Sequence, residues 1–244
     1  MNKEISKQHT QVPNEMAKNE LDPKDQLIYL AIKSFQNGQT GLCNPSLQKI
    51  AERSGASIPT VRSSIKRLEE KEYIILKKKG RGQEYLFSSY KNFEPFSKEF
   101  LEKEDLSFTT KSYLVASQQY MYQDIEGFGK ISFPNTKLSE KINMPESTIR
   151  KCNQELKRKN YLTIIENESR DIETGCKTET KLFNLNELGQ AVIWVLKTHE
   201  DRINDHEDRL NEMQSDLDNY KKLVDSLIKE NQELKKSKTK EFIL

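Results

Sequence analysis

Basic side chains concentrate between Pro45 and Gln83, in a pattern that suits contact with a polyanion. This stretch holds ten Lys or Arg residues against four Glu, whereas the whole chain has a formal net charge of only +2. Lys and Arg contact phosphate oxygens, and Arg can also read the O6 and N7 atoms of guanine. A local excess of positive charge in a near-neutral chain indicates nucleic acid as the partner.

Two short helices are predicted to position these charges. The first ends at Gly55, because a tight turn between helices needs a residue that tolerates positive φ. Ser57 can cap the second helix, which carries Pro59 in its first turn and runs to about Lys71. The helical spacing of apolar and small residues predicts which side chains face the core. They are Ile50, Ala51, Ser54, Val61, Ile65 and Leu68.

A hairpin is predicted directly after the second helix. Residues 73–76 and 84–87 read as strands, and the turn between them is rich in Lys and Gly. A Gly-x-Gly frame places Arg81 at the tip, which favours a phosphate contact over a merely solvated turn.

This helix–turn–helix–hairpin pattern resembles the winged helix-turn-helix family of bacterial DNA-binding proteins. The resemblance is close from Ile50 to Phe87 and extends more loosely back to Asp22, where a capped helix begins. It implies that the second helix enters the major groove and that the hairpin, or wing, touches the backbone or minor groove. The expected groove contacts are Thr60, Arg62, Ser63, Lys66 and Arg67, and the expected phosphate contacts are Lys77, Lys78, Lys79 and Arg81.

The pattern recurs 88 residues further along the chain. Thr148-Ile149-Arg150 matches Thr60-Val61-Arg62, and Tyr161 matches Tyr73. A helix over about residues 109–122 takes the part of the helix that begins at Asp22. A repeat this consistent predicts two winged-helix domains rather than one.

The second copy differs in its charge. Its second helix, from about Glu146 to Arg158, still exposes basic and polar side chains, but its wing, residues 166–175, is long and acidic. This wing is not expected to lie along phosphates, so a protein-docking role for the second domain stays open. The DNA contacts expected from this copy are Ser147, Thr148, Arg150, Lys151, Gln154 and Lys157.

From Gly189 onward the chain shows heptads without Pro or Gly, which is typical of a coiled coil. Flanking charges are complementary in a parallel pair, and Asn231 at an a position favours two strands in register. Extra apolar residues near the end leave a higher order or a partner helix open. Two d positions hold histidines (His199 and His206), which we interpret as weak core positions rather than a pH switch. The dimer contacts expected are Leu196, Ile203, Leu210, Met213, Leu217, Tyr220, Val224, Leu227, Asn231 and Leu234.

The predicted fold class is mainly α with small β-wings. The expected order is a disordered tail (1–20), a first winged-helix domain (21–87), a linker with a short helix (88–107), a second winged-helix domain (108–187), a parallel coiled coil (188–236) and a basic tail (237–244).

Composition argues against several other classes of protein. No apolar run is long enough to span a membrane, and three widely spaced cysteines suit a reducing cytoplasm rather than a disulfide framework. For a DNA-binding protein we expect a cytoplasmic location in association with the nucleoid. No Cys or His lies at metal-ligand spacing, and no phosphate-binding Gly loop or nucleophile–base pair is present in the sequence. We therefore expect no enzyme activity, no metal and no cofactor.

The sequence predicts a dimeric, sequence-specific binder of double-stranded DNA, with a transcription regulator slightly favoured. The tandem arrangement is also similar to plasmid and phage replication initiators, which use two winged helices on repeated origin sites. It suits a transcription regulator of a mobile element as well, and a partition protein that couples DNA to a partner through its coiled coil. A coiled-coil scaffold whose winged helices bind proteins is the remaining alternative.

Overall fold

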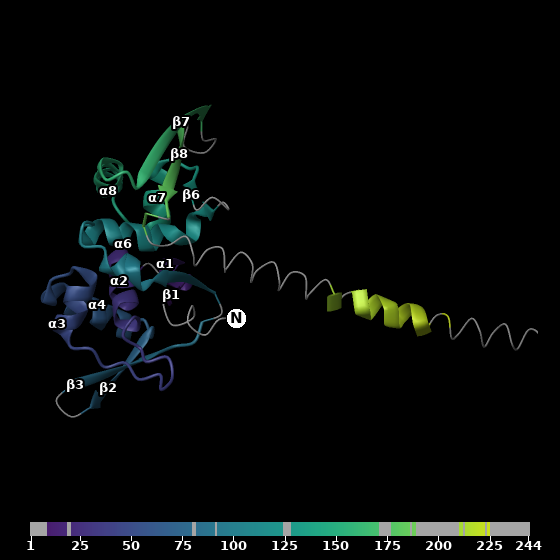
Figure 1. Cartoon of the computed structure of the whole chain (residues 1–244), viewed down its shortest axis with the longest axis horizontal. Coiled ribbons are helices and arrows are strands. Elements are labelled where there is room, and N and C mark those ends of the chain that lie inside the picture. Colours follow the sequence, from purple (N-terminus) through teal and green to yellow (C-terminus); the bar gives the residue numbers. More distant parts are fainter. Residues whose placement is uncertain are drawn as a thin grey trace, which may run out of the picture. The chain divides into compact units, whose positions relative to one another are not determined.

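The structure is a computed structural model of the whole chain. It describes residues 9–18, 21–79, 82–90, 92–123, 128–170, 177–185, 187–188, 210–211, 213–222 and 224. The chain divides into two units, Met1–Val195 and Leu196–Leu244. Among the described residues, no helix is long and apolar enough to cross a membrane. Figure 1 shows the order of the elements along the chain.

The predicted helices and hairpin are present in the first half of the first unit. The elements are α2 (Pro23–Lys33), α3 (Leu47–Ser54), α4 (Ile58–Glu70), β2 (Ile74–Lys79) and β3 (Gly82–Phe87).

The local signals for these elements act as the sequence predicts. Gly55 ends α3 in the left-handed region at φ 76°, and the Ser57 side chain caps α4 by accepting from the Thr60 backbone N–H. The strands β2 and β3 pair antiparallel from Ile74 opposite Phe87 onward. All six side chains predicted to face the core of these helices are buried.

A second copy of this arrangement follows in the same unit. Its elements are α6 (Phe108–Ser117, continued by a 3-10 turn over Gln118–Tyr120), α7 (Asn135–Ile142), α8 (Glu146–Arg158), β7 (Leu162–Arg170) and β8 (Lys177–Asn184).

The repeat is present in the backbone as well as in the sequence. The helices α7 and α8 begin and end 88 residues after α3 and α4. Asn143 takes the left-handed conformation after α7, as Gly55 does after α3. Asn160 and Glu72 share a φ of 61° just after α8 and α4, again 88 residues apart. These turns therefore have the same geometry in both copies.

The two copies differ in their sheets. The short strands β5 (Tyr122–Gln123) and β6 (Phe128–Ile131) join β7 and β8 in a four-stranded sheet of order β5-β6-β8-β7. The first copy has no strand that corresponds to β6 among its described residues. There, a backbone hydrogen bond from the Tyr85 N–H to the Cys43 carbonyl oxygen takes the place of the β6–β8 pairing. The sequence predicts only the hairpin of this sheet, because β5 and β6 are too short to show a pattern.

The N-terminal segment departs from the sequence prediction of a disordered tail. Residues 9–13 form β1 (His9–Pro13), followed by α1 (Glu15–Lys18). The partner of β1 is β4 (Phe93–Ser97), which lies in the expected linker just before the short helix α5 (Lys98–Glu102). Val12 and Met16 are buried, at 3% and 0% exposure. A partner strand about eighty residues away leaves no local signal in the sequence.

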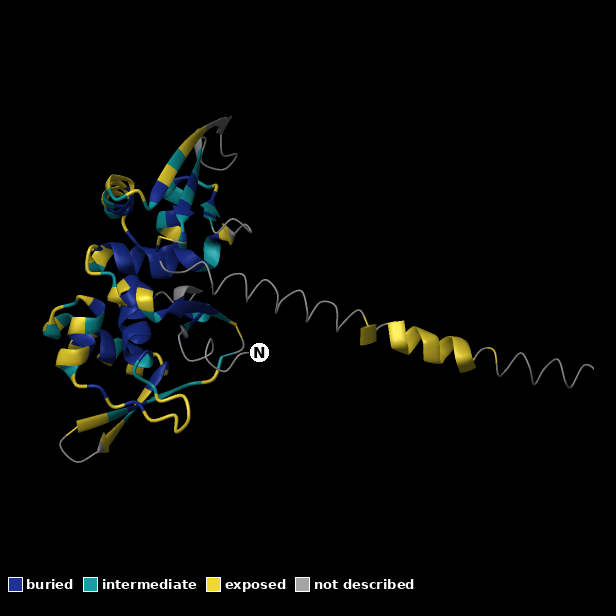
Figure 2. Cartoon of the chain, viewed as in Figure 1, coloured by how far each residue is buried: buried dark blue, intermediate teal, exposed yellow. Residues whose placement is uncertain are grey.

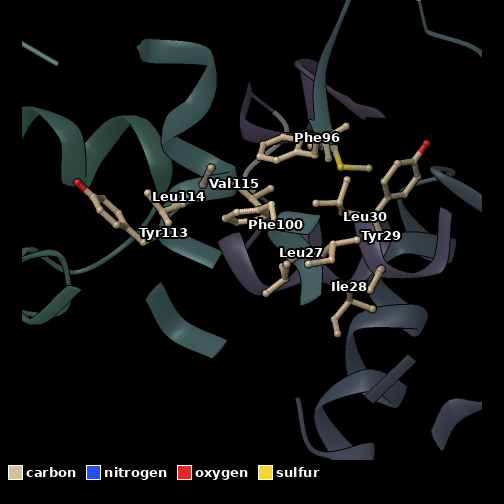
Figure 3. Close-up of a cluster of buried hydrophobic side chains, with 14 of the residues drawn as sticks. Leu27, Ile28, Tyr29, Leu30, Phe96, Phe100, Tyr113, Leu114 and Val115 are labelled. Carbon is tan, nitrogen blue, oxygen red and sulfur yellow. The ribbon is translucent and has the colours of Figure 1, made fainter. Parts of the chain in front are cut away.

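The helices α2 and α6 pack against each other between the two copies. The side chains of α2 from Asp25 to Ile32 are all buried, because α3, α4, β1 and α6 surround the helix. Figure 2 shows this buried centre, and Figure 3 shows Leu27 and Leu30 of α2 in one cluster with Leu114 of α6 and Phe100 of α5. One apolar core therefore joins both copies.

In the second unit, the described residues 210–211, 213–222 and 224 are helical. Of the predicted coiled-coil positions, Leu196, Ile203, Leu227, Asn231 and Leu234 lie outside the described residues, as do both d-position histidines. The large apolar side chains of the described positions are all exposed, from 49% for Leu217 to 68% for Met213.

Candidate nucleic-acid interface

The outer face of α4 presents a row of polar and basic side chains to solvent. Arg62, Ser63 and Lys66 are exposed, and Thr60 is partly exposed. Two hydroxyl bonds order the start of the row, since Ser63 Oγ donates to the Thr60 carbonyl at 2.9 Å and the Thr60 and Ser57 hydroxyls lie 2.8 Å apart. Lys66 reaches Glu70 at 3.6 Å, an exposed pair that leaves its ammonium hydrated. In the described part of the chain Arg62 forms no ion pair.

Arg67 occupies a different position from the one that the sequence predicts. Its Nε and one Nη donate to the two carboxylate oxygens of Asp25 at 2.8 and 2.6 Å. Asp25 is fully buried in the first turn of α2, and the Arg67 side chain is 41% exposed. The hydrogen bond to Asp25 raises the pKa of the Arg67 guanidinium. This bidentate pair ties α4 to α2, so Arg67 has a structural partner rather than a free guanidinium for the groove.

The residue equivalent to Arg67 in the second copy also anchors its helix, but it is an acid that accepts hydrogen bonds. Glu155 stands 88 residues after Arg67, and its carboxylate accepts from the backbone N–H and hydroxyl of Ser107 at 2.9 and 2.6 Å. It also accepts from the Thr110 hydroxyl at 2.6 Å. Ser107 caps α6, just as Asp22 caps α2. The helices α4 and α8 are therefore each anchored to the start of the first helix of their own copy, α2 and α6 respectively.

The contacts of Glu155 predict how the stability of the protein changes at low pH. Burial would raise the pKa of Glu155, but the bonds from Ser107, Thr110 and Lys159 outweigh it and lower the pKa to about 2 from an ordinary 4.5. Because the folded-state pKa is depressed, the contribution of Glu155 is complete above about pH 4.5 and is lost as the pH falls towards 2. We expect wild type to lose more stability over this window than Glu155→Gln, measured as urea midpoints between pH 2 and 6.

The matched control for this prediction is Glu140→Gln, at an exposed position on α7. We expect its midpoint to follow that of wild type across the window. Parallel pH profiles for wild type and Glu155→Gln would show that the carboxylate does not anchor α8.

On α8, five of the six residues predicted to contact DNA are exposed, and the sixth is partly exposed. Lys151, Gln154 and Lys157 are exposed along with Ser147, and Thr148 is partly exposed. Arg150 is exposed too, but its guanidinium donates to Glu146 one turn earlier at 3.0 and 2.6 Å. A contact between Arg150 and a base must therefore replace this exposed ion pair, which costs little.

The β2–β3 hairpin carries the first copy's basic wing. Lys77 and Lys78 are exposed on β2, opposite Glu84 and Gln83. The backbone of Lys79 belongs to β2, whereas its side chain and Arg81 lie outside the described residues.

The sequence does not single out the anchoring residues Asp25, Ser107, Thr110 and Glu155. One signal was available, because Asp25 and Thr110 both stand three residues after a helix cap, and Arg67 and Glu155 are 88 residues apart. Within the described ranges, no group of His, Cys, Asp and Glu is placed to hold a metal ion.

The similarity found between this chain and known proteins lies in the first copy. A search among curated proteins finds no match to this chain. Residues 19–74, which span α2, α3 and α4 and reach the first residue of β2, match a family described as a helix-turn-helix domain. The chain therefore contains a helix-turn-helix domain, and this domain supports DNA binding.

Proposed function

We propose that this protein binds double-stranded DNA sequence-specifically and acts as a dimer. The observation that carries the proposal is the helix-turn-helix domain, in which the outer face of α4 is polar and basic. Such a helix fits the major groove, where Arg62 can reach guanine while Ser63 and Lys66 contact neighbouring groups. The exposed Lys77 and Lys78 continue the positive charge along β2.

Two winged-helix domains are the architecture that we propose for the first unit. The matching bounds of α3–α4 and α7–α8 support it, as does a hairpin after each pair. In this scheme Arg67 holds α4 in place and does not read bases, which changes the role expected from the sequence. The second domain adds weaker contacts through Lys151, Gln154 and Lys157, because its hairpin lacks the lysine run of β2.

Dimerisation through the second unit is supported by the exposed stripe on its helix. Leu210, Met213, Leu217, Tyr220 and Val224 recur at intervals of three and four residues, and each is about half or more exposed. Such a stripe on a polar helix is the pattern that a second, parallel helix covers. A dimer presents two DNA-binding units at high effective concentration, which strengthens a weak individual contact.

The wing predicts a sequence-independent contribution to affinity. Lys78→Ala should weaken binding to all DNA sequences alike and flatten the slope of log K against log salt by about one unit, since one phosphate contact is lost.

Arg62→Ala should instead relax the preference at one base pair, by about 1–3 kcal/mol. Fluorescence anisotropy titrations at several salt concentrations measure both effects. A uniform loss of affinity for both variants would contradict the assignment of Arg62 to base reading.

We propose transcription regulation as the biological role. The test is an occupancy map of the tagged protein in its native host, with footprints of the strongest sites. Binding at a few promoters over an inverted repeat is the expected result. Protection of an array of direct repeats beside an origin would contradict regulation and indicate a replication initiator or partition protein, and an absence of enriched DNA would indicate a protein scaffold.

A further inference from the structure

The four-stranded sheet β5-β6-β8-β7 has one buried face and one face that is open to solvent. Side chains alternate between the two faces along each strand, and the register of the strands carries this alternation across the sheet. The inner face packs on α6, where the rings of Phe183 and Tyr113 lie 6.3 Å apart between centroids. Leu162, Lys181 and Ile131 are buried on the same face as Phe183. The opposite face, here called the outer sheet face, receives side chains from all four strands.

The outer sheet face is rich in large apolar side chains. They are Tyr122, Phe128, Ile165 and Leu182. Tyr122 is 73% exposed and Ile165 is 47% exposed, and the other two are partly exposed. The remaining side chains of this face are polar and uncharged apart from Lys130. Apolar side chains that gather on one exposed face mark an interaction surface, whereas single ones need no explanation.

The first copy shows that the fold does not require this surface. Ile165 stands 88 residues after Lys77, and its cross-strand neighbour Thr180 takes the place of Glu84. A charged pair in the first hairpin is thus an uncharged pair in the second. The two aromatic side chains come from β5 and β6, which have no counterpart strands among the described residues of the first copy. Such a face does not suit DNA, which attracts positive charge.

The occupant that the chain itself favours is the same face of a second copy. Leu188, which is buried at the end of the second domain, precedes the first heptad position, Leu196, by eight residues. Eight residues reach at most about 29 Å, so a parallel coiled coil would keep two second domains at high effective concentration. Two outer sheet faces can pack together without burying a carboxylate, and the long side chain of Lys130 can keep its ammonium in water.

We propose that the outer sheet face docks on the same face of a second copy of this chain. The proposal rests on the proposed dimer and adds to it a contact between the two second domains. None of the side chains on this face belongs to the DNA contacts expected from the sequence, so docking leaves the exposed face of α8 available.

Substitution of the two most exposed apolar side chains tests the proposal in the full-length protein. Tyr122→Glu together with Ile165→Glu should raise the dissociation constant of the dimer at least about tenfold in sedimentation equilibrium, because docking would bury the new carboxylates. Both side chains are about half or more exposed, so the variant should fold like wild type, which circular dichroism checks. The matched control is Ile75→Glu, at an isoleucine of the β2–β3 hairpin that is 54% exposed, and it should leave the constant unchanged.

Hydroxyl-radical footprinting of Tyr122 reports on the contact directly. Its oxidation should be several-fold slower in wild type than in full-length Leu217→Glu with Val224→Glu, which removes the proposed coiled-coil pairing. Equal oxidation in a dimeric wild type and in this variant would overturn the docking alone, as would a Tyr122→Glu/Ile165→Glu protein that dimerises as tightly as Ile75→Glu. A wild-type chain that is monomeric in these assays would overturn the proposed dimer together with the docking.

Discussion

Arg67→Met should lower the free energy of unfolding of the first unit by about 3 kcal/mol. The substitution keeps much of the stem of Arg67 but removes the guanidinium that donates twice to Asp25. Asp25 is fully buried, so its carboxylate then has neither that partner nor water. Breaking a buried pair from one side costs roughly 3–5 kcal/mol, and we take the lower end because Arg67 is partly exposed. Urea unfolding at neutral pH measures the loss.

The neighbouring Lys66→Met is the matched control. Lys66 is 77% exposed and meets Glu70 at 3.6 Å, so its removal should cost less than about 0.5 kcal/mol. The double variant Asp25→Asn with Arg67→Met should be more stable than Arg67→Met alone, because it removes the buried charge. If Arg67→Met were as stable as Lys66→Met but lost discrimination between DNA sequences, Arg67 would be a DNA-contacting residue and not a structural anchor of α4.

Leu217→Glu together with Val224→Glu should reduce affinity for DNA by about 10²-fold or more. Both side chains stand on the exposed apolar stripe, at the a positions of successive heptads. Glutamates there would face each other across the proposed two-stranded seam, and like charges at its centre prevent pairing. A monomer loses the effective concentration of the second DNA-binding unit. Light scattering gives the oligomeric state, and anisotropy gives the affinity.

The control for this prediction lies on the opposite side of the same helix. Ser215 occupies an outward heptad position, so Ser215→Glu adds charge without touching the stripe. We expect this variant to remain dimeric and to bind DNA like wild type. A wild-type chain that is monomeric at micromolar concentration, or a double variant that still binds at full strength, would contradict the role proposed for the stripe.

Local chemistry made much of the first unit predictable. Gly55, Ser57 and Pro59 have few alternatives to a helix end, a cap and a first turn, and they give the end of α3 and the start of α4. The 88-residue offset then carries those bounds to α7 and α8, where the second copy holds Asn143 in place of the glycine.

The features that the sequence misses depend on distant partners. β1 forms because β4 lies beside it, and the residues around His9 carry no local pattern that predicts a strand. Arg67 falls on the outer face of α4 by periodicity, and only the position of Asp25, forty-two residues earlier, turns it inward. The buried circumference of α2 likewise follows from the approach of α6, which a pattern within α2 cannot encode.

Sequence reading by the α4 face is tested most directly by selection from a random duplex pool with the purified full-length protein. We predict that successive rounds enrich one motif, and that Arg62→Ala enriches the same motif with one position relaxed. Failure to enrich any sequence at low salt, where phosphate contacts are strongest, would contradict the claim.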